Sequence, residues 1–258
     1  MVEGYLSDDE YPRFFEQLNG LRRRIVADLP IEPGMRILDL ATGYGYFAMT
    51  VARQVAGVKI VGIDLSRSDV CKAHRNSRKG GLTSCIKIVQ MDATSMGFRN
   101  GSFDVVVNFL GLEDIHMTRG RGGVQRTFME ASRVLKSRGD FCFVTMPPEE
   151  MDSQAQKLET AVFSYTCGAT WLSLGEYKRM LAEAGFELTR KASYYTGKKL
   201  TPKQAREYIG FACENVPKIY GVRTSSFEKV WQRFGKDIDN YGLGYYSKVV
   251  LCRARKVV

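Results

Sequence analysis

Two glycines stand between a predicted strand and a predicted helix in the first quarter of the chain. The apolar run Arg36–Leu40 is followed by Ala41, Thr42, Gly43, Tyr44 and Gly45, and a helical pattern begins directly after them. Glycine lets the backbone turn sharply and approach a ligand closely, and open α/β folds bind ligands at the carboxyl ends of their strands. A ligand at this turn is therefore expected, but a Gly-x-Gly pair by itself also fits any tight strand-to-helix turn.

Two aspartates follow at the ends of the next two predicted strands. Asp64 ends the run Val61–Asp64, about 20 residues after the glycine turn, where a carboxylate can accept both hydroxyls of a ribose. Asp92 lies just after the third predicted strand, which ends at Val89, and its neighbours Met91 and Ala93 are apolar. A single aspartate at a strand end is more often a turn or capping residue, but three features at one edge of a sheet favour a binding site.

One segment, Leu112–Met117, contains candidate residues for acid–base catalysis. It follows the fourth predicted strand at the same edge of the sheet. It contains Asp114 and His116, and a histidine there could deprotonate an acceptor because its unperturbed pKa lies near neutrality. The alternative is that His116 is a loop or capping residue. The other histidine, His74, is predicted on a helix surface. The six cysteines form no C-x-x-C pair, which predicts free thiols and no metal site.

The elements that must position these residues follow from the hydrophobic pattern. Short β-branched runs alternate with helical stretches, which predicts a mainly parallel sheet covered by helices on both faces. Beyond the fifth run the pattern predicts a loop at Pro147 and Pro148, a helix near 174–184, a sixth strand from Phe186 toward Tyr195 and a last strand over 245–255. The five β-branched runs are Arg36–Leu40, Lys59–Ile63, Ile86–Val89, Phe103–Val107 and Phe141–Val144.

Three segments lack a place in this core. An amphipathic helix is predicted from Ser7 to near Pro30, and a helical region is predicted from Thr201 to about Ile238. With the stretch 147–170, these could cover the carboxyl edge of the sheet. The expected organisation is an N-terminal helix (1–32) over the site, a core formed by 33–200 and 243–258, and a helical insertion or lid (201–242).

At these residues the chain resembles the class I S-adenosylmethionine-dependent methyltransferases, and within them the C-methyltransferases of ubiquinone and menaquinone biosynthesis. The resemblance implies a Rossmann-like seven-stranded sheet, mostly parallel with the last strand antiparallel, helices on both faces and a helical insertion before the last strand. It covers roughly 32–144 and the final strand pair. The motifs that carry it are Leu38–Gly45, Gly62–Ser66, Met91–Ala93, Phe103–Val106 and Ala131–Lys136.

The resemblance also implies roles for individual residues. Asp39 and the backbone from Ala41 to Gly45, with Thr42 and Gly43, would hold the methionine part of S-adenosylmethionine, and Asp64 would hold its ribose. Asp92 would hold the adenine amine. Asn108 and Leu110 would lie beneath the sulfonium. Leu65, Met91 and Ala93 complete the expected cofactor site. The family often has glycine where this chain has Ala41, which is a minor departure because Ala-Thr-Gly versions occur in the same branch.

Two related chemistries fit the sequence less well. A nicotinamide-dependent dehydrogenase needs Gly-x-Gly-x-x-Gly, and here the third position is Ala48. Tyr195 and Lys199 have the Tyr-x-x-x-Lys spacing of short-chain dehydrogenases, but Gly197 between them predicts a turn rather than one helix face. The Pro-Pro-aromatic motif of amino-methylating branches is replaced by Phe109-Leu110-Gly111 after Asn108, which disfavours methylation of adenine N6 or a glutamine amide.

Charge is concentrated at one end of the chain. The net charge is +10, and residues 190–258 hold 15 of the 38 Lys and Arg but only 5 of the 28 Asp and Glu. This basic quarter favours an anionic small-molecule acceptor, methylated by direct displacement. The alternatives are RNA or a protein side chain as acceptor, although the sequence has no dedicated nucleic-acid-binding motif, and a non-catalytic S-adenosylmethionine-binding regulator. With no apolar run of membrane-spanning length and an acidic N-terminus, a cytoplasmic protein is expected; oligomeric state is not predicted.

Overall fold

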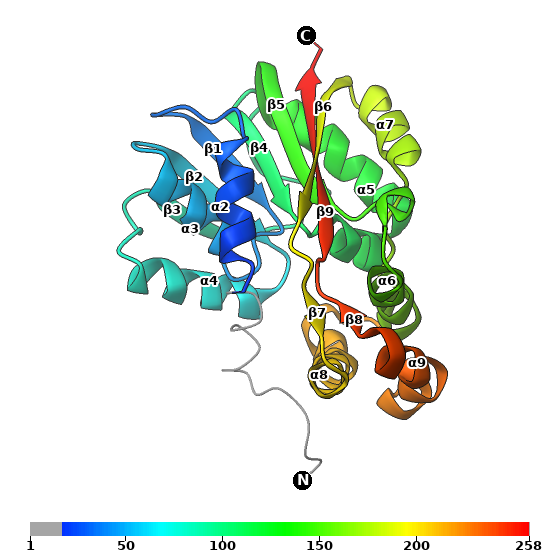
Figure 1. Ribbon diagram of the computed structural model, residues 1–258. Helices are drawn as coiled ribbons and strands as arrows, with labels where there is room; N and C mark the ends of the chain where they lie inside the picture. The colour runs from blue at the N-terminus through cyan, green and yellow to red at the C-terminus, as the bar shows by residue number, and fades with distance from the viewer. Residues whose placement is uncertain (1–16, 258) are drawn as a thin grey trace.

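The computed structural model describes residues 17–257, and its centre is one seven-stranded sheet (Figure 1). The strand order is β3-β2-β1-β4-β5-β9-β6, and β9 alone runs antiparallel, pairing with β5 on one side and β6 on the other. The predicted fold class is therefore confirmed, including the antiparallel last strand. The strands are β1 (Arg36–Leu40), β2 (Lys59–Asp64), β3 (Ile86–Gln90), β4 (Phe103–Phe109), β5 (Leu135–Thr145), β6 (Phe186–Tyr195) and β9 (Lys248–Lys256).

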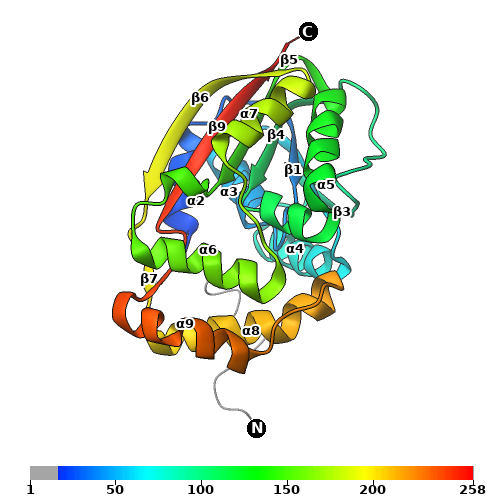
Figure 2. The same cartoon turned by 90° about the vertical axis from the view of Figure 1, so that its right-hand side faces the viewer.

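Helices cover both faces of the sheet, because the strands are apolar on both sides. On one face lie α2 (Asn19–Ala27), α3 (Tyr46–Gln54) and α4 (Arg67–Lys79), whose apolar residues share a core with Val105 and Val107 of β4. On the other face lie α5 (Leu112–Val134) and α7 (Leu174–Glu183), which share a core with Val106 and the aromatic side chains of β5. Figure 2 shows α5 and α7 in front of the strands.

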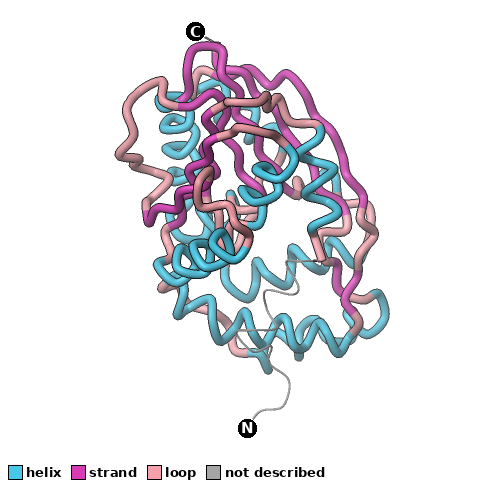
Figure 3. The backbone as a smooth tube through the Cα atoms, turned by 90° about the vertical axis from the view of Figure 1, so that its left-hand side faces the viewer, coloured by secondary structure: helices cyan, strands magenta, loops and turns pink. Residues whose placement is uncertain are grey.

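A helical layer lies beyond the end of the sheet where β9 begins. It consists of the short helix η1 (Pro148–Glu150), α6 (Gln154–Cys167), α8 (Pro202–Tyr220) and α9 (Phe227–Tyr241). A two-stranded sheet of β7 (Lys199–Leu200) and β8 (Leu243–Gly244) joins both ends of the α8–α9 segment to the rest of the chain. Figure 3 shows this layer below the strands, and in Figure 2 α6, α8 and α9 run side by side.

Several predicted bounds are wrong. The loop predicted after Pro148 contains α6, the fifth strand begins at Leu135 rather than at Phe141, and the pair β7 and β8 was not predicted. The early start of β5 includes Arg138 at φ 59° and a register shift against β4, which break the alternation of the sequence pattern. The predicted start of the N-terminal helix at Ser7 lies outside the described residues, and α2 is the described part of it.

All six cysteines are free. Among residues 17–257, no group of three or more histidines, cysteines, aspartates and glutamates is placed to hold a metal ion. Over the same residues, the structure has no helix with the length and hydropathy needed to cross a membrane.

Candidate functional site

The glycine turn after β1 is held by the side chain of Asp39. Thr42 Oγ1 donates to Asp39 Oδ2 over 2.6 Å, and both side chains are buried. Ala41, Gly43 and Gly45 all have positive φ, at 51°, 52° and 79°. A Cβ added to Gly43 would meet nothing within 4 Å, so the turn faces open space at Gly43, whereas Gly45 packs against Ala73. Burial raises the pKa of Asp39 to about 7, against the opposing effect of the Thr42 hydrogen bond.

Asp64, the last residue of β2, connects this turn to the next strand. Its Oδ2 accepts the backbone N–H of Gly43 over 2.8 Å, and its Oδ1 accepts the N–H of Ser66 over 2.9 Å. Burial raises the pKa of Asp64, while these backbone donors lower it. Each carboxylate oxygen has a further lone pair, and the residue lines a cavity, so the side chain can accept hydrogen bonds from a ligand.

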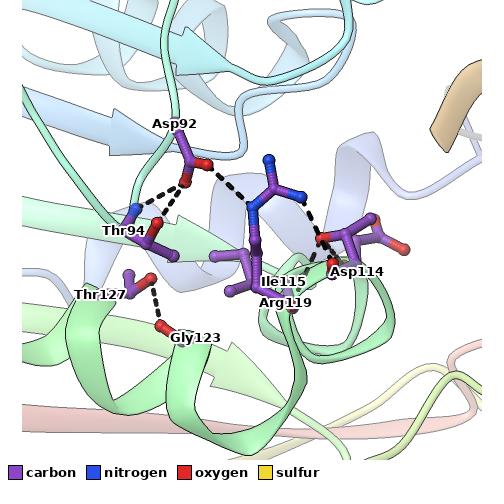
Figure 4. A network of polar contacts seen from close by, with 8 residues as sticks. Asp92, Thr94, Asp114, Ile115, Arg119, Gly123 and Thr127 are labelled. Carbon is purple, nitrogen blue, oxygen red and sulfur yellow. Dashed lines mark hydrogen bonds and ion pairs between the residues drawn. The ribbon is translucent and has the colours of Figure 1, made fainter. Parts of the chain in front are cut away.

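Asp92 lies beside a small second cavity of about 40 Å³, whose lining includes Leu65, Met91 and Ala93. Its Oδ1 accepts hydrogen bonds from the backbone N–H of Thr94 over 2.8 Å and from the Thr94 hydroxyl over 2.7 Å. Its Oδ2 accepts a hydrogen bond from Nε of Arg119 over 2.9 Å (Figure 4). Partial burial alone would raise the pKa of Asp92, but these hydrogen bonds outweigh it and hold the pKa below the usual value. The pairing with Arg119 was not predicted.

Asn108 lies at the end of β4, and its side chain is buried. Its Nδ2 donates to Leu40 O over 2.8 Å, and its Oδ1 accepts the N–H of Gly111 over 3.3 Å. It is not among the cavity-lining residues, whereas Leu110, at φ 56°, is. Asn108 therefore fixes the backbone at the ends of β1 and β4.

The structure does not bring His116 and Asp114 together in one site. Asp114 lines both cavities, and burial together with the neighbouring Glu113 and Asp64 carboxylates raises its pKa. His116 lines neither cavity. Burial and the nearby Arg121 lower the pKa of His116, and its Nδ1 has no partner among the described residues.

The larger cavity, of about 180 Å³, extends from the glycine turn to the helical layer. One part of its lining is acidic, and Arg22 of α2 is the only cation among the described residues that line it. The rest is mostly apolar and aromatic, contributed by α3, by the end of β4, by α6, by the segment before α7 and by α8. The acidic residues are Asp39, Asp64, Asp69, Glu113, Asp114 and Glu159, and the largest apolar ones are Phe109, Phe163, Trp171, Tyr208 and Phe211.

Sequence reasoning missed four of the charged lining residues, namely Arg22, Asp69, Glu113 and Glu159. Arg22 lies in a run of three arginines, which reads as a solvated helix face. Glu113 lies directly before the chosen Asp114, and its place in the first turn of α5 was the available signal. Glu159 lies in α6, where no helix was predicted. Its carboxylate accepts the backbone N–H of Tyr246 over 2.9 and 3.2 Å, and burial raises its pKa to about 8.

This geometry can hold a nucleoside-like cofactor. The open backbone of the glycine turn, the lining carboxylate of Asp64 and the small cavity beside Asp92 follow one another along the carboxyl ends of β1, β2 and β3. They match, in order, an amino-acid group, a ribose and a flat base. The donors and acceptors therefore fit the cofactor that the sequence motifs indicated.

Comparison with known proteins identifies the class. Residues 31–185 match a family described as a methyltransferase domain. The chain is 29% identical to 27-O-demethylrifamycin SV methyltransferase of Amycolatopsis mediterranei, with 96% of this chain and 87% of that protein covered. It is 31% identical to the demethylmenaquinone methyltransferase of Thermus thermophilus, with 49% of this chain and 54% of that protein covered.

The fold comparison agrees. A putative methyltransferase from Bacillus halodurans has a TM-score of 0.63 at 22% identity, with 92% of this chain and 99% of that chain covered. Geranyl diphosphate C-methyltransferase from Streptomyces coelicolor has a TM-score of 0.60 at 18% identity, with 94% and 80% covered. The chain belongs to the methyltransferase domain family, and it is a class I S-adenosylmethionine-dependent methyltransferase.

Proposed function

We propose that this enzyme methylates a small molecule that binds in the larger cavity, between the glycine turn and helices α6 and α8. The observation that carries the proposal is the continuity of one lining, in which Asp39, Gly43 and Asp64 share a cavity with Phe163 and Phe211. Direct displacement requires the methyl donor and its acceptor to lie in contact, with the reacting atoms held in an aligned geometry.

The cofactor end of the cavity is assigned residue by residue. We assign the methionine part of the cofactor to Asp39 and the turn from Ala41 to Gly45, and the ribose to Asp64. The adenine would occupy the small cavity, with its amine on Asp92. Asn108 would act indirectly, by holding the backbone that leads to Leu110. When bound, S-adenosylmethionine supplies a methyl group on a positively charged sulfur.

The acceptor end of the cavity favours an apolar molecule. Aromatic and aliphatic side chains dominate there, and six acidic residues line the cavity against one arginine. An anionic acceptor, as the charge distribution predicted, would have Arg22 as its single cationic partner among the described lining residues. Lys198, Lys199 and Arg206 do not line the cavity, and Arg206 stacks on Trp231 at 3.8 Å. The anionic acceptor remains a prediction, and a neutral one fits the lining better.

We infer that residues 201–242 form a lid, because Tyr208, Phe211 and Tyr220 of α8 all line the cavity. Leu18 and Arg22 place the N-terminal segment at the same opening. A cover of this kind excludes water during transfer and leaves room for a small acceptor. It argues against RNA or a protein side chain as the acceptor. A cytoplasmic location remains a prediction.

The test is transfer of a labelled methyl group from S-adenosylmethionine into a cell extract, followed by separation of small molecules, RNA and protein. The proposal expects the label among the small molecules. Label in RNA or protein alone would overturn it. An Asp64→Ala control should lose the transfer together with cofactor binding.

A further inference from the structure

Glu113 lines the larger cavity and has one unpaired carboxylate oxygen. It lies in the first turn of α5, its side chain is 5% exposed, and it lines the cavity. Its Oε2 has no hydrogen-bond partner among the described residues. Leaving such an atom unpaired costs free energy, so native proteins pair nearly all of them, with protein, water or ligand.

Trp171, just before α7, lines the same cavity and has an unpaired hydrogen-bond donor. The residue is 9% exposed, and its indole Nε1 has no partner among residues 17–257. An indole N–H can only donate, and an ionised carboxylate can only accept. A ligand that satisfies both groups must therefore carry a proton donor and an oxygen or nitrogen lone pair.

The surroundings of Glu113 favour uptake of a proton. Burial raises the pKa of Glu113, and the nearby carboxylate of Glu159 raises it further, while a hydrogen bond from the backbone of Glu113 lowers it. Glu159 differs because both of its oxygens accept the Tyr246 N–H. Both residues line the cavity, and of these two carboxylates Glu113 is the one with an unpaired oxygen. A raised pKa brings its basicity closer to the working pH of a general base.

We propose that the acceptor is a neutral, hydroxyl-bearing molecule whose O–H donates to Glu113 Oε2, and that Glu113 takes this proton during methyl transfer. Trp171 Nε1 donates to another oxygen of the same molecule. The inference rests on the proposed function and adds the acceptor atom and the base.

Other ligand classes fit the two atoms less well. An anion would enter a cavity lined by six acidic residues and one arginine, and an ammonium group has no lone pair for Trp171. A metal ion lacks a ligand set, since no suitable cluster exists among residues 17–257. A neutral molecule with a hydroxyl and a second oxygen satisfies both atoms and the apolar lining.

The transfer balances with these groups alone. The oxygen–methyl bond forms as the carbon–sulfur bond of the cofactor breaks, the sulfur keeps the electron pair, and the hydroxyl proton moves to Glu113. The protonated Glu113 then returns the proton to water. No oxidant, reductant or metal ion is required.

Binding can be tested without turnover. The probes are 2-naphthol and 2-methoxynaphthalene, which differ in the hydroxyl hydrogen, titrated into protein saturated with S-adenosylhomocysteine. Wild type should bind 2-naphthol about tenfold or more tightly than the ether, as expected for a hydrogen bond to a charged group. In Glu113→Leu the preference should fall below about twofold by the same reasoning. Equal affinities of the two probes in wild type, or binding of neither, would overturn the proposal.

Transfer supplies the second test. With ¹³C-methyl-labelled S-adenosylmethionine and extract, the labelled small-molecule product should show an O-methyl signal by NMR. Glu113→Gln should reduce its formation roughly 100-fold, the usual effect of losing a general base. The matched control is Glu183→Gln, an exposed glutamate of α7, which should leave the rate unchanged. An N-, S- or C-methyl product, or an undiminished rate in Glu113→Gln, would contradict the proposal.

The affinity for S-adenosylhomocysteine serves as the reference measurement for both tests. Glu113→Gln and Glu113→Leu should bind S-adenosylhomocysteine as wild type does and should melt at a higher temperature, because each removes an unpaired buried carboxylate. If the label instead appeared only in RNA or protein, the proposed small-molecule function would fail, whatever the probes show.

Discussion

The backbone N–H of Gly43 donates to Asp64 Oδ2 over 2.8 Å and so joins the glycine turn after β1 to the end of β2. The two motifs that the sequence placed at one edge of the sheet are thus in direct contact. Asp64 holds the shape of the turn, and the same carboxylate lines the cavity where a ribose would bind.

Asp64→Ala should therefore weaken S-adenosylhomocysteine binding by about tenfold or more, because it removes a charged hydrogen-bond acceptor worth about 1.5–3 kcal/mol. Isothermal titration calorimetry measures the effect. Asp239→Ala, an exposed aspartate of α9, is the matched control and should bind as wild type does. Equal affinities of the Asp64 variant and the wild type would remove Asp64 from the cofactor site.

Ala41 adopts a left-handed backbone conformation, at φ 51°, which favours glycine. Ala41→Gly should raise the free energy of unfolding by about 0.5–1 kcal/mol, since relief of the strain exceeds the entropy lost with alanine. The same change at Ala161, exposed within α6, should lower it by about 1 kcal/mol. Urea denaturation compares the two, and destabilisation by Ala41→Gly would show that the strain is absent.

Burial raises the pKa of Glu159 from 4.5 to about 8, which makes the stability of the protein depend on pH. The folded state then holds a proton that the unfolded state releases above pH 4.5. Its contribution to stability is full below pH 4.5 and is lost as pH rises toward 8, by at most about 1.4 kcal/mol per pH unit.

The glutamine in Glu159→Gln cannot ionise. As pH rises from 5 to 8, the free energy of unfolding of this variant should therefore increase relative to that of wild type. Urea denaturation of both proteins at each pH gives the difference directly. A constant difference across this range would mean that Glu159 ionises normally in the folded protein.

The sheet could be predicted because most of its strands contain short apolar runs rich in β-branched residues. Such runs are specified locally, and the right-handed connections of a parallel sheet leave few arrangements. The order of β1 to β4 and their carboxyl ends then place Asp39, Asp64 and Asp92 along one edge, as the motifs indicated. The assigned roles of these residues remain predictions.

The acceptor side could not be predicted from local pattern. Helix α6 buries Gln156, Glu159 and Thr166, so its inward face is partly polar and shows no apolar period. Gln156 and Glu159 pair with backbone groups of Lys248 and Tyr246, which come from a distant part of the chain. Thr166 donates to Val162 O within the helix. Likewise, the partner of Asp92 is Arg119, which reaches it from the end of the first part of α5, before the kink at Gly120.

The methyl acceptor is proposed to bind in the larger cavity, and the most direct test is to block that cavity. Val216 of α8 is half-buried and lines the cavity, whereas Val222, also half-buried, does not. The measurement is the rate of labelled methyl transfer from S-adenosylmethionine into the small-molecule fraction of an extract. Val216→Trp should lower this rate about tenfold or more, through overpacking of the acceptor site, with S-adenosylhomocysteine affinity unchanged. Val222→Trp should transfer as wild type does. Undiminished transfer by Val216→Trp would show that the acceptor binds elsewhere and would contradict the account.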